Sequence, residues 1–219
     1  MKEPDAAHMH DNHPPALFLA GSAGLDFLNS VATPAADTTI DWLDNGIGLL
    51  NWLKQSHLVP AETLDALYAQ AMPGELDRVA EQARDLREWF RTFVRERKGR
   101  PISAEHLRAL EPLNRLLQRD EAFSQIMVLD GGARDALALR TARRWRSPES
   151  LLLPIGQALA KLVCEEDFSD VKACEGPNCT LIFVDHTRGR KRRWCSMAIC
   201  GNRTKAAVHR KRLKAAHAN

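Results

Sequence analysis

Four cysteines near the end of the chain are the residues whose type and spacing best suit a chemical role. They form two pairs in the pattern C-x4-C-x15-C-x4-C, at Cys174, Cys179, Cys195 and Cys200. Two short loops that each supply two thiolates suit a tetrahedral zinc ion, which holds its sulfur ligands at about 2.3 Å. Because four thiolates leave zinc no open position, we expect one structural Zn²⁺ that takes no part in catalysis.

Other interpretations of the cysteine pattern stay open at this point. The same residues could be buried cysteines without a metal, or they could hold an iron–sulfur cluster. His186 or His209 could replace one cysteine as a zinc ligand. The fifth cysteine, Cys164, lies in an apolar segment typical of a helix, and we expect it in the core. An odd number of cysteines confined to the last quarter of the chain does not suit a disulfide framework.

The residues around the cysteines predict the elements that bring them together. Gly-Pro-Asn at 176–178 supplies a turn between the first two cysteines. The segments that follow are expected to form a strand, a turn, a returning strand and a helix, at 180–184, 187–190, 192–194 and 202–216. Ser196 or Asn202 could cap that helix. This order of a cysteine loop, a hairpin, a second cysteine loop and a helix predicts a small treble-clef-like zinc module.

The same part of the chain is strongly basic. Residues 172–219 hold 12 Lys and Arg against two acids, a charge of +10, which leaves −7 for the rest of a chain whose total is +3. Such asymmetry indicates a tail that meets an anion, most often nucleic acid. Zinc with four thiolates has a net charge of −2 and lowers the module only to about +8. The candidate nucleic-acid contacts are Arg188, Arg190, Lys191, Arg192, Arg193, Arg203, Lys205, Arg210, Lys211 and Lys214.

These cations allow more than one role. On the expected helix, Arg203, Arg210 and Lys214 share one stripe, and strand alternation would let either Arg192 or Arg193 join it. Arg203 could instead lie beside the thiolates. The others could form a solvated basic face, but like charges with few acids nearby repel one another, which disfavours that interpretation.

The longer part of the chain, before the zinc module, has the periodicity of helices. Residues 75–97 place apolar side chains at steps of three or four, and the helix after Ser103 is expected to turn Leu107, Leu110, Leu113 and Leu117 inward. Strands at 124–129 and 136–140 are expected to flank a turn at 130–132 (Asp-Gly-Gly). Further helices are expected to begin near residue 24, over 46–55, after Pro60 and over 148–164. The expected fold class is mainly α: a helical N-terminal domain with one β-hairpin, followed by the zinc module.

Two sets of residues carry a resemblance to known families. Cys-Gly-Asn-Arg at 200–203 spells the signature of the CGNR zinc finger, and residues 174–203 resemble that module throughout. Residues 25–30 (LDFLNS) and 83–90 (ARDLREWF) resemble the ABATE domain that precedes it, with Ser30 where Thr is common. Such proteins are described as stress-induced transcription regulators. The resemblance implies four zinc ligands, at the four paired cysteines, and a DNA-binding role.

Together, these patterns predict three segments. Residues 1–15 are expected to be a disordered tail, residues 16–168 an ABATE-like domain for sensing or dimerisation, and residues 169–219 the basic CGNR zinc finger. The expected function is a DNA-binding transcription regulator. Its expected partners are duplex DNA, a second copy of the chain, and an unknown small-molecule or stress signal.

Two alternatives to DNA binding are considered. The zinc module could bind RNA or a protein, or the N-terminal part could be an enzyme with Asp26, Asn29, Asp41 and His57 as its polar candidates. No nucleophile–base pair or phosphate loop supports the enzyme, so we expect none. Asp26 and Asn29 are the first choice if a ligand pocket exists, but hydrogen bonds within or between domains are the favoured role for both.

The sequence excludes membrane classes. The longest apolar stretch, at 151–164, is interrupted by polar residues and is too short to span a bilayer. The N-terminus has no basic segment followed by an apolar one, as a secretory signal would. We therefore expect a cytoplasmic protein.

Overall fold

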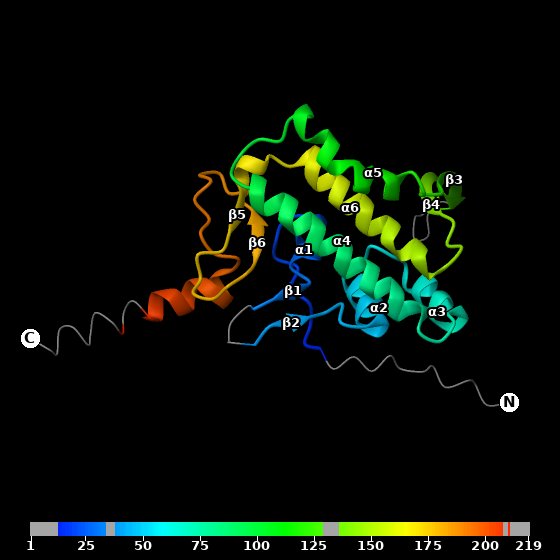
Figure 1. The fold of residues 1–219 in the computed structure, drawn as a ribbon, viewed down its shortest axis with the longest axis horizontal. Coiled ribbons are helices and arrows are strands. Elements are labelled where there is room, and N and C mark those ends of the chain that lie inside the picture. The colour runs from blue at the N-terminus through cyan, green and yellow to red at the C-terminus, as the bar shows by residue number, and fades with distance from the viewer. Residues whose placement is uncertain (1–12, 34–37, 129–135, 208–209, 211–219) are drawn as a thin grey trace, which may run out of the picture.

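A computed structural model describes residues 13–33, 38–128, 136–207 and 210 (Figure 1). Over these residues the protein is mainly helical, with short antiparallel strand pairs and a C-terminal cysteine module, which confirms the expected fold class. Several expectations fall outside the described residues: the tail up to residue 12, the turn at 130–132, His209, Lys211, Lys214 and the end of the terminal helix.

The helices follow the apolar periodicity of the sequence. They are α1 (Ala23–Leu28), α2 (Gly46–Gln55), α3 (Ala61–Gln70), α4 (Glu75–Arg97), α5 (Glu111–Leu117) and α6 (Leu152–Glu165). Asn45 caps α2 by accepting a hydrogen bond from the Gly48 amide at 2.9 Å. On α4 the stripe that includes Leu76, Val79 and Phe90 is buried. The expected helices over 46–55 and 75–97 are therefore confirmed.

The helices pack mainly against α6 and α4. α1 lies against both, α5 covers α6, and α2 covers α4. The contact between α1 and α6 is close at Gly24, where a Cβ atom would lie 2.8 Å from the Ala158 carbonyl oxygen. A glycine at this position therefore lets α1 approach α6 closely.

Two expectations about the core are wrong. The segment after Ser103 forms a 3₁₀ helix (Ala104–Leu110) before α5, and Leu107 is 61% exposed. This 3₁₀ helix lies at the margin of the helix layer (Figure 1), and α5 after it packs on α6. Cys164 is also exposed. The buried stripe of α6 includes Ile155, Leu159 and Leu162, and Cys164 lies on the opposite face.

The strands form antiparallel pairs. β1 (Val31–Ala32) pairs with β2 (Ile40–Asp41), β3 (Ala122–Val128) with β4 (Leu137–Arg143), and β5 (Val171–Ala173) with β6 (Ile182–Val184). The β3–β4 pair confirms the hairpin expected in the N-terminal part.

The hairpin expected inside the zinc module is wrong in its pairing. β6 pairs with β5, which precedes the first cysteine, and residues 192–194 form no strand. The reason lies in the loop after β6. The Arg192 amide donates to the Asp185 carboxylate at 2.8 Å and not to a strand carbonyl. A side chain thus takes the hydrogen bond that a returning strand would have used.

The zinc module and the helices share one hydrophobic cluster. Phe183, Val184 and Cys200 belong to the same buried set as the side chains of α1, α4 and α6. The Val184 amide also donates to the Ala20 carbonyl at 2.8 Å, so the segment before α1 lies along β6. The position of the module is therefore set by packing against the helical part.

Candidate metal centre and basic surface

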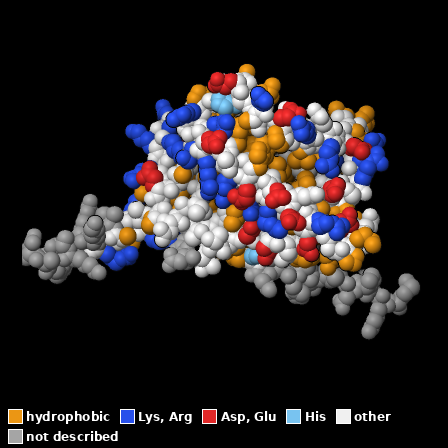
Figure 2. Space-filling model, viewed as in Figure 1, with side chains coloured by type: hydrophobic (Ala, Val, Ile, Leu, Met, Phe, Trp, Pro, Cys, Tyr) orange, Lys and Arg blue, Asp and Glu red, His pale blue; other side chains and the backbone are white. Residues whose placement is uncertain are grey.

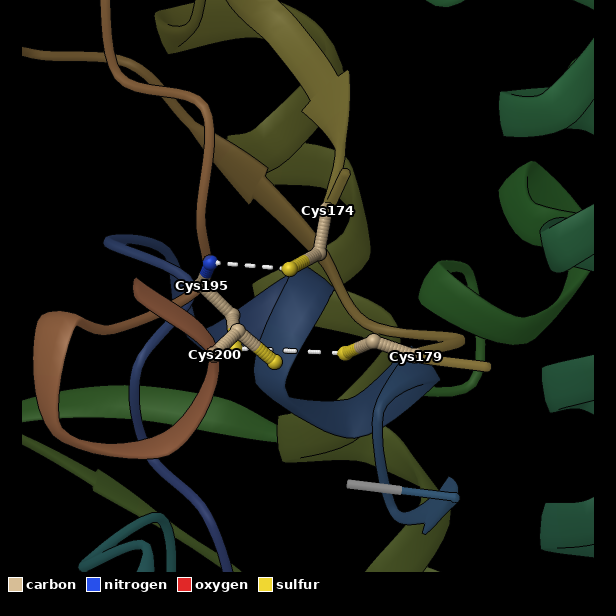
Figure 3. A group of neighbouring side chains, drawn as sticks. All are labelled: Cys174, Cys179, Cys195 and Cys200. Atoms are coloured by element: carbon tan, nitrogen blue, oxygen red, sulfur yellow. Dashed lines mark hydrogen bonds between the residues drawn. The ribbon is translucent and has the colours of Figure 1, made fainter. Parts of the chain in front are cut away.

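The four paired cysteines converge on one point. Cys174 follows β5, Cys179 closes the first loop, and Cys195 and Cys200 flank the second, so that their sulfur atoms point toward one another (Figure 3). All four sulfurs lie within 4.8 Å of one another, and the Cys179 and Cys195 sulfurs are 3.9 Å apart. A tetrahedron with zinc–sulfur bonds of about 2.3 Å has sulfurs about 3.8 Å apart. The donor set therefore fits one structural zinc ion.

Backbone amides are arranged to support negative charge on the sulfurs. The amides of Cys195 and Gly176 donate to the Cys174 sulfur at 3.2 and 3.4 Å (Figure 3 shows the first). Arg203 Nη2 donates to the Cys200 sulfur at 3.5 Å. Such outer contacts stabilise thiolates and fix their orientation around a metal. Arg203, whose role the sequence left open, thus lies beside the thiolates.

Glycine is required inside the first loop. A Cβ atom on Gly176 would lie 2.6 Å from the Cys200 sulfur and 3.4 Å from the Cys174 sulfur. Gly201 is less confined, since a Cβ there would lie 2.6 Å from the sulfur of Met197, a flexible side chain that is 46% exposed and can move aside.

The thiols cannot all ionise without a cation. The hydrogen bond between Cys195 and Cys179 lowers the pKa of the Cys179 thiol. The same bond, together with burial and the charge on Cys179, raises the pKa of Cys195. Burial likewise raises the pKa of the Cys200 thiol. Four thiolates so close together need a divalent cation to offset their repulsion, which is the charge that zinc supplies.

Asp185 organises the loop between the two cysteine pairs. It is fully buried and accepts hydrogen bonds from Lys172 Nζ at 2.6 Å, from the hydroxyl and amide of Thr187, and from the Arg192 amide. Burial opposes its ionisation, but these donors outweigh burial and hold its pKa well below the usual range. From the sequence, Asp185 was recognisable only as one of the two acids in residues 172–219. An Asp two residues before a Thr in a basic loop is the turn signal that could have identified it.

Three of the candidate nucleic-acid contacts make internal bonds. The Arg192 guanidinium donates to the backbone carbonyls of Leu19, Trp194 and Cys195 and stacks 4.1 Å from the Phe183 ring centre. Arg190 pairs with an acid, Asp170, at 3.1 Å. Arg193 pairs with Glu175 at 2.6 Å, but both of these side chains are more than half exposed. Arg192 therefore holds the module together, and Arg190 also donates to the Asp185 carbonyl. The side chains of Arg190 and Arg193 are both more than half exposed.

Apart from Arg203 beside the thiolates, the other candidates that the structure describes face solvent. The side chains of Arg188, Lys191, Lys205 and Arg210 are exposed and make no hydrogen bond or ion pair to any described residue. Figure 2 shows Lys and Arg side chains gathered at the end of the molecule that holds β5 and β6, whereas acidic and basic side chains are mixed over α4. The basic surface predicted from composition is thus present at that end of the fold.

An open hollow of about 580 Å³ lies within this basic surface. Its floor is mainly apolar and includes Trp194 and Met197, and Lys191, Arg193 and Thr187 stand around it. Met197 is 46% exposed.

Asn29 joins the helical part to the zinc module, and Asp26 binds the segment before α1. The Asn29 side chain donates to the Ile182 carbonyl at 2.8 Å and accepts from the Ile182 amide at 3.0 Å. Asp26 accepts from the Ala20 amide at 2.9 Å, and burial raises its pKa to about 6 against the opposing effect of that hydrogen bond and of the charge on Arg192. Both side chains thus make the internal hydrogen bonds that the sequence analysis favoured.

A pocket of about 260 Å³ lies beside the start of α1. Ser22 and Ala23 line it together with Arg143, Gln157 and Lys161. Asp26 and Asn29 are not among its lining residues.

The polar candidates for an enzyme do not assemble into a catalytic group. Arg87 binds both Asp41 carboxylate oxygens at 2.7 Å, and its Nη1 also donates to the Ser30 hydroxyl at 3.0 Å. Burial opposes the ionisation of Asp41, but Arg87 holds its pKa below the usual range. His57 is exposed after α2, and its side chain makes no hydrogen bond to the other candidates within the described residues. The hydrogen bond from Arg87 to Ser30 connects residues 83–90 to residues 25–30, the two segments that resembled the ABATE domain.

His186, considered above as a substitute ligand, lies apart from the sulfurs. It is exposed and bonds to Glu166 at 2.7 Å, and the group of potential ligands holds cysteines alone. Among the described helices, none combines the length and apolar character needed to cross a membrane.

Comparison with known families agrees with this arrangement. Residues 171–213 match the model of the CGNR zinc finger. Residues 21–166 match the ABATE family, described as "Putative stress-induced transcription regulator". Neither description is that of an enzyme. No curated protein matches the chain. Since the ABATE match extends over more than half of its length, the chain belongs to the ABATE family, and it has a CGNR zinc finger at its C-terminal end.

Proposed function

We propose that this protein is a cytoplasmic DNA-binding transcription regulator whose zinc module contacts duplex DNA. In this proposal, residues 16–168 sense a signal or dimerise, and residues 169–219 bind DNA. The observation that carries it is the set of exposed cations left after the internal ion pairs are formed. Arg188, Lys191, Lys205 and Arg210 have no acid beside them in the described part of the chain. Phosphate groups of a duplex would supply the missing negative charge.

The proposal divides the basic residues by role. Arg188, Lys191, Lys205 and Arg210 would contact phosphates, and Arg193 would join them by leaving Glu175, since their pairing is exposed. Lys211 and Lys214, which lie outside the described residues, are further candidates for phosphate contacts. Arg190, Arg192 and Arg203 would act indirectly, because they hold the loop and the sulfurs in place.

Zinc would act as a structural brace in this proposal. The four cysteines would hold the ion, whose charge makes four thiolates stable side by side. One π-helical turn at Met197–Gly201 ends the second cysteine loop, and the terminal helix begins directly after it. The ion would thereby fix both the basic loop and the start of the helix against the same core.

Asp26 and Asn29 would transmit a signal to the module. Asp26 lies on α1 and Asn29 caps its C-terminal end, and α1 also borders the 260 Å³ pocket through Ala23 at its first turn. A shift of α1 would move the two hydrogen bonds from Asn29 to Ile182, and with them β6.

Binding of single-stranded RNA is less well supported. Such binding needs exposed aromatic rings on which bases can stack. Phe183 is fully buried, and Trp194 is partly covered, with the Arg193 guanidinium 5.1 Å from its ring centre. The module thus offers cations in place of stacking platforms, which favours a duplex.

The test uses the full-length zinc-loaded chain and a pool of randomised duplexes at about 150 mM salt. We expect retention of DNA with an enriched motif. With about six phosphate contacts, the logarithm of the affinity should fall with the logarithm of salt concentration at a slope of about −5. The double variant Arg188→Glu/Lys191→Glu should bind more weakly and show a slope smaller by about 2.

A matched control separates this surface from net charge. Arg78 and Arg108 are exposed, lie outside the zinc module and make no ion pair to a described residue, so Arg78→Glu/Arg108→Glu changes the total charge equally. Its salt slope should stay as in the wild type. If the folded zinc protein retains no duplex, or if both double variants lose affinity alike, the proposal is wrong. Preferential binding of structured RNA at the same salt would favour the alternative.

A further inference from the structure

The β3–β4 hairpin carries a cluster of large apolar side chains in solvent. Ile126, Leu137 and Leu139 are 70–71% exposed, and Val128 is 52% exposed. The register pairs Ile126 with Leu139 and Val128 with Leu137. Directly paired residues, and residues two apart on a strand, point to the same side of a sheet. The four side chains therefore form one apolar face, which we call the hairpin face.

The hairpin face is the more exposed side of the strand pair. The opposite side carries Phe123 and Ala142 toward the base, both partly covered, and Arg144 packs 5.1 Å from the Phe123 ring centre. Nearer the end that side carries Met127, which is 46% exposed. The most exposed apolar side chains of the pair therefore lie on the hairpin face. A two-stranded sheet is marginally stable in water unless a further layer covers it.

Among the described residues, the outer part of the hairpin face carries no charge. The residues that share it, Ser124 and Thr141, are neutral, and Arg143 at the base is held by two hydrogen bonds of 2.7 Å from its guanidinium to Asp120. Arg140 lies on the opposite side, paired with Gln125. The described residues of the hairpin face therefore offer no free positive charge to a nucleic acid or an acidic protein. A surface that is neutral, apolar and the same in both copies is complementary to itself, since a two-fold contact brings each residue opposite its own partners.

We propose that a second copy of this chain covers the hairpin face, with the two hairpins stacked face to face around a two-fold axis. Sheets stacked in this way pack about 10 Å apart with interdigitating side chains. The hairpin and the zinc module lie at opposite ends of the long axis of the molecule (Figure 1). The contact leaves both zinc modules accessible, and it does not depend on DNA binding.

The test measures the mass of the zinc-loaded full-length chain by sedimentation over a range of concentrations. The wild type should reach the mass of a dimer and dissociate on dilution. Leu139→Glu places a charge at the centre of the contact and should raise the dimer dissociation constant by about tenfold or more. Ile126→Glu on the paired strand should have the same effect. Each variant should keep its zinc content, its helical circular dichroism and its affinity for DNA per module.

Leu107→Glu is the matched control, because Leu107 is a comparably exposed leucine, at 61%, outside the hairpin. Its dimer dissociation constant should equal that of the wild type. A wild type that remains monomeric at about 100 μM would overturn the proposal, since a dimer that weak contributes little at ordinary concentrations. A dimer that survives both hairpin variants with an unchanged dissociation constant would overturn it as well.

Discussion

Two short apolar segments of this protein have nearly the same sequence and opposite environments. Ile182-Phe183-Val184 forms β6, and each of the three is at most 5% exposed. Ile126-Met127-Val128 ends β3, and the three are 46–71% exposed. Both segments pair with one antiparallel strand. The comparison shows that hydrophobicity and strand pairing do not by themselves bury a segment.

The difference arises from what lies beside each strand. β6 is bound on one side by β5, along another by the segment that ends at Ala20, and from α1 by the Asn29 side chain. The residues at the end of β3 have β4 as their strand partner within the described chain. One strand is thus closed into the core by three neighbours, whereas the other leaves a face for a partner.

The largest effect should come from removing the metal that holds the module against β6. Cys200→Ser should lose zinc and lower the melting temperature of the whole chain by on the order of 10 °C, because a structural zinc contributes several kcal/mol to folding. Metal analysis and calorimetry would measure both. The control is Cys164→Ser, whose thiol is exposed and outside the metal centre. Equal zinc content in the two variants would contradict the assignment of the ligands.

The next effect compares two isoleucines directly. Ile182→Ala should destabilise the protein by about 2–5 kcal/mol, since it empties a packed site. Ile126→Ala should change the stability of the monomer by about 0.5 kcal/mol or less, because the side chain is largely in water. Urea unfolding at low protein concentration measures both free energies. Similar values for the two variants would contradict the burial that distinguishes the strands.

Asn29 tests the hydrogen bonds that close β6. Asn29→Ala leaves the buried amide and carbonyl of Ile182 without their partners and should cost about 2–4 kcal/mol. Asn29→Asp keeps an acceptor for the amide but loses the donor to the carbonyl, so it cannot restore both bonds. Hydrogen exchange at the Ile182 amide should speed up in Asn29→Ala. Unchanged protection of this amide would show that other contacts position β6.

The smallest predicted effect concerns pH. The pKa of Asp26 is raised from 3.8 to about 6, so the folded protein binds this proton more tightly than the unfolded chain does. The resulting stability is fully present below pH 3.8 and is lost as the pH rises through 6. Relative to the wild type, Asp26→Asn should therefore gain about 1–3 kcal/mol of stability between pH 4 and pH 7. Urea unfolding of both proteins across this range measures it, and a constant difference would contradict the shifted pKa.

The zinc site could be predicted from the sequence because its chemistry is local. Four cysteines in two short loops, with glycine and proline between the first pair, can surround a metal in few ways. The long helices were equally predictable, since the periodicity of α4 extends over its whole length. The pairing of β6 was not, because both neighbours offered strand-like residues and Asp185 decided between them through a buried carboxylate.

The sequence by itself determined the metal ligands, the helical character of the larger part and the charge difference between the two parts of the chain, because residue type and spacing suffice for each. Only the tertiary structure decided which arginines make internal bonds and which stay exposed, and which apolar strand faces water. Arg192 and Arg188 lie four residues apart in one basic loop, yet the first is bonded to three backbone carbonyls and the second is exposed. The physical reason is that burial and pairing depend on neighbours distant in sequence, as Leu19 is from Arg192 and Asn29 is from Ile182.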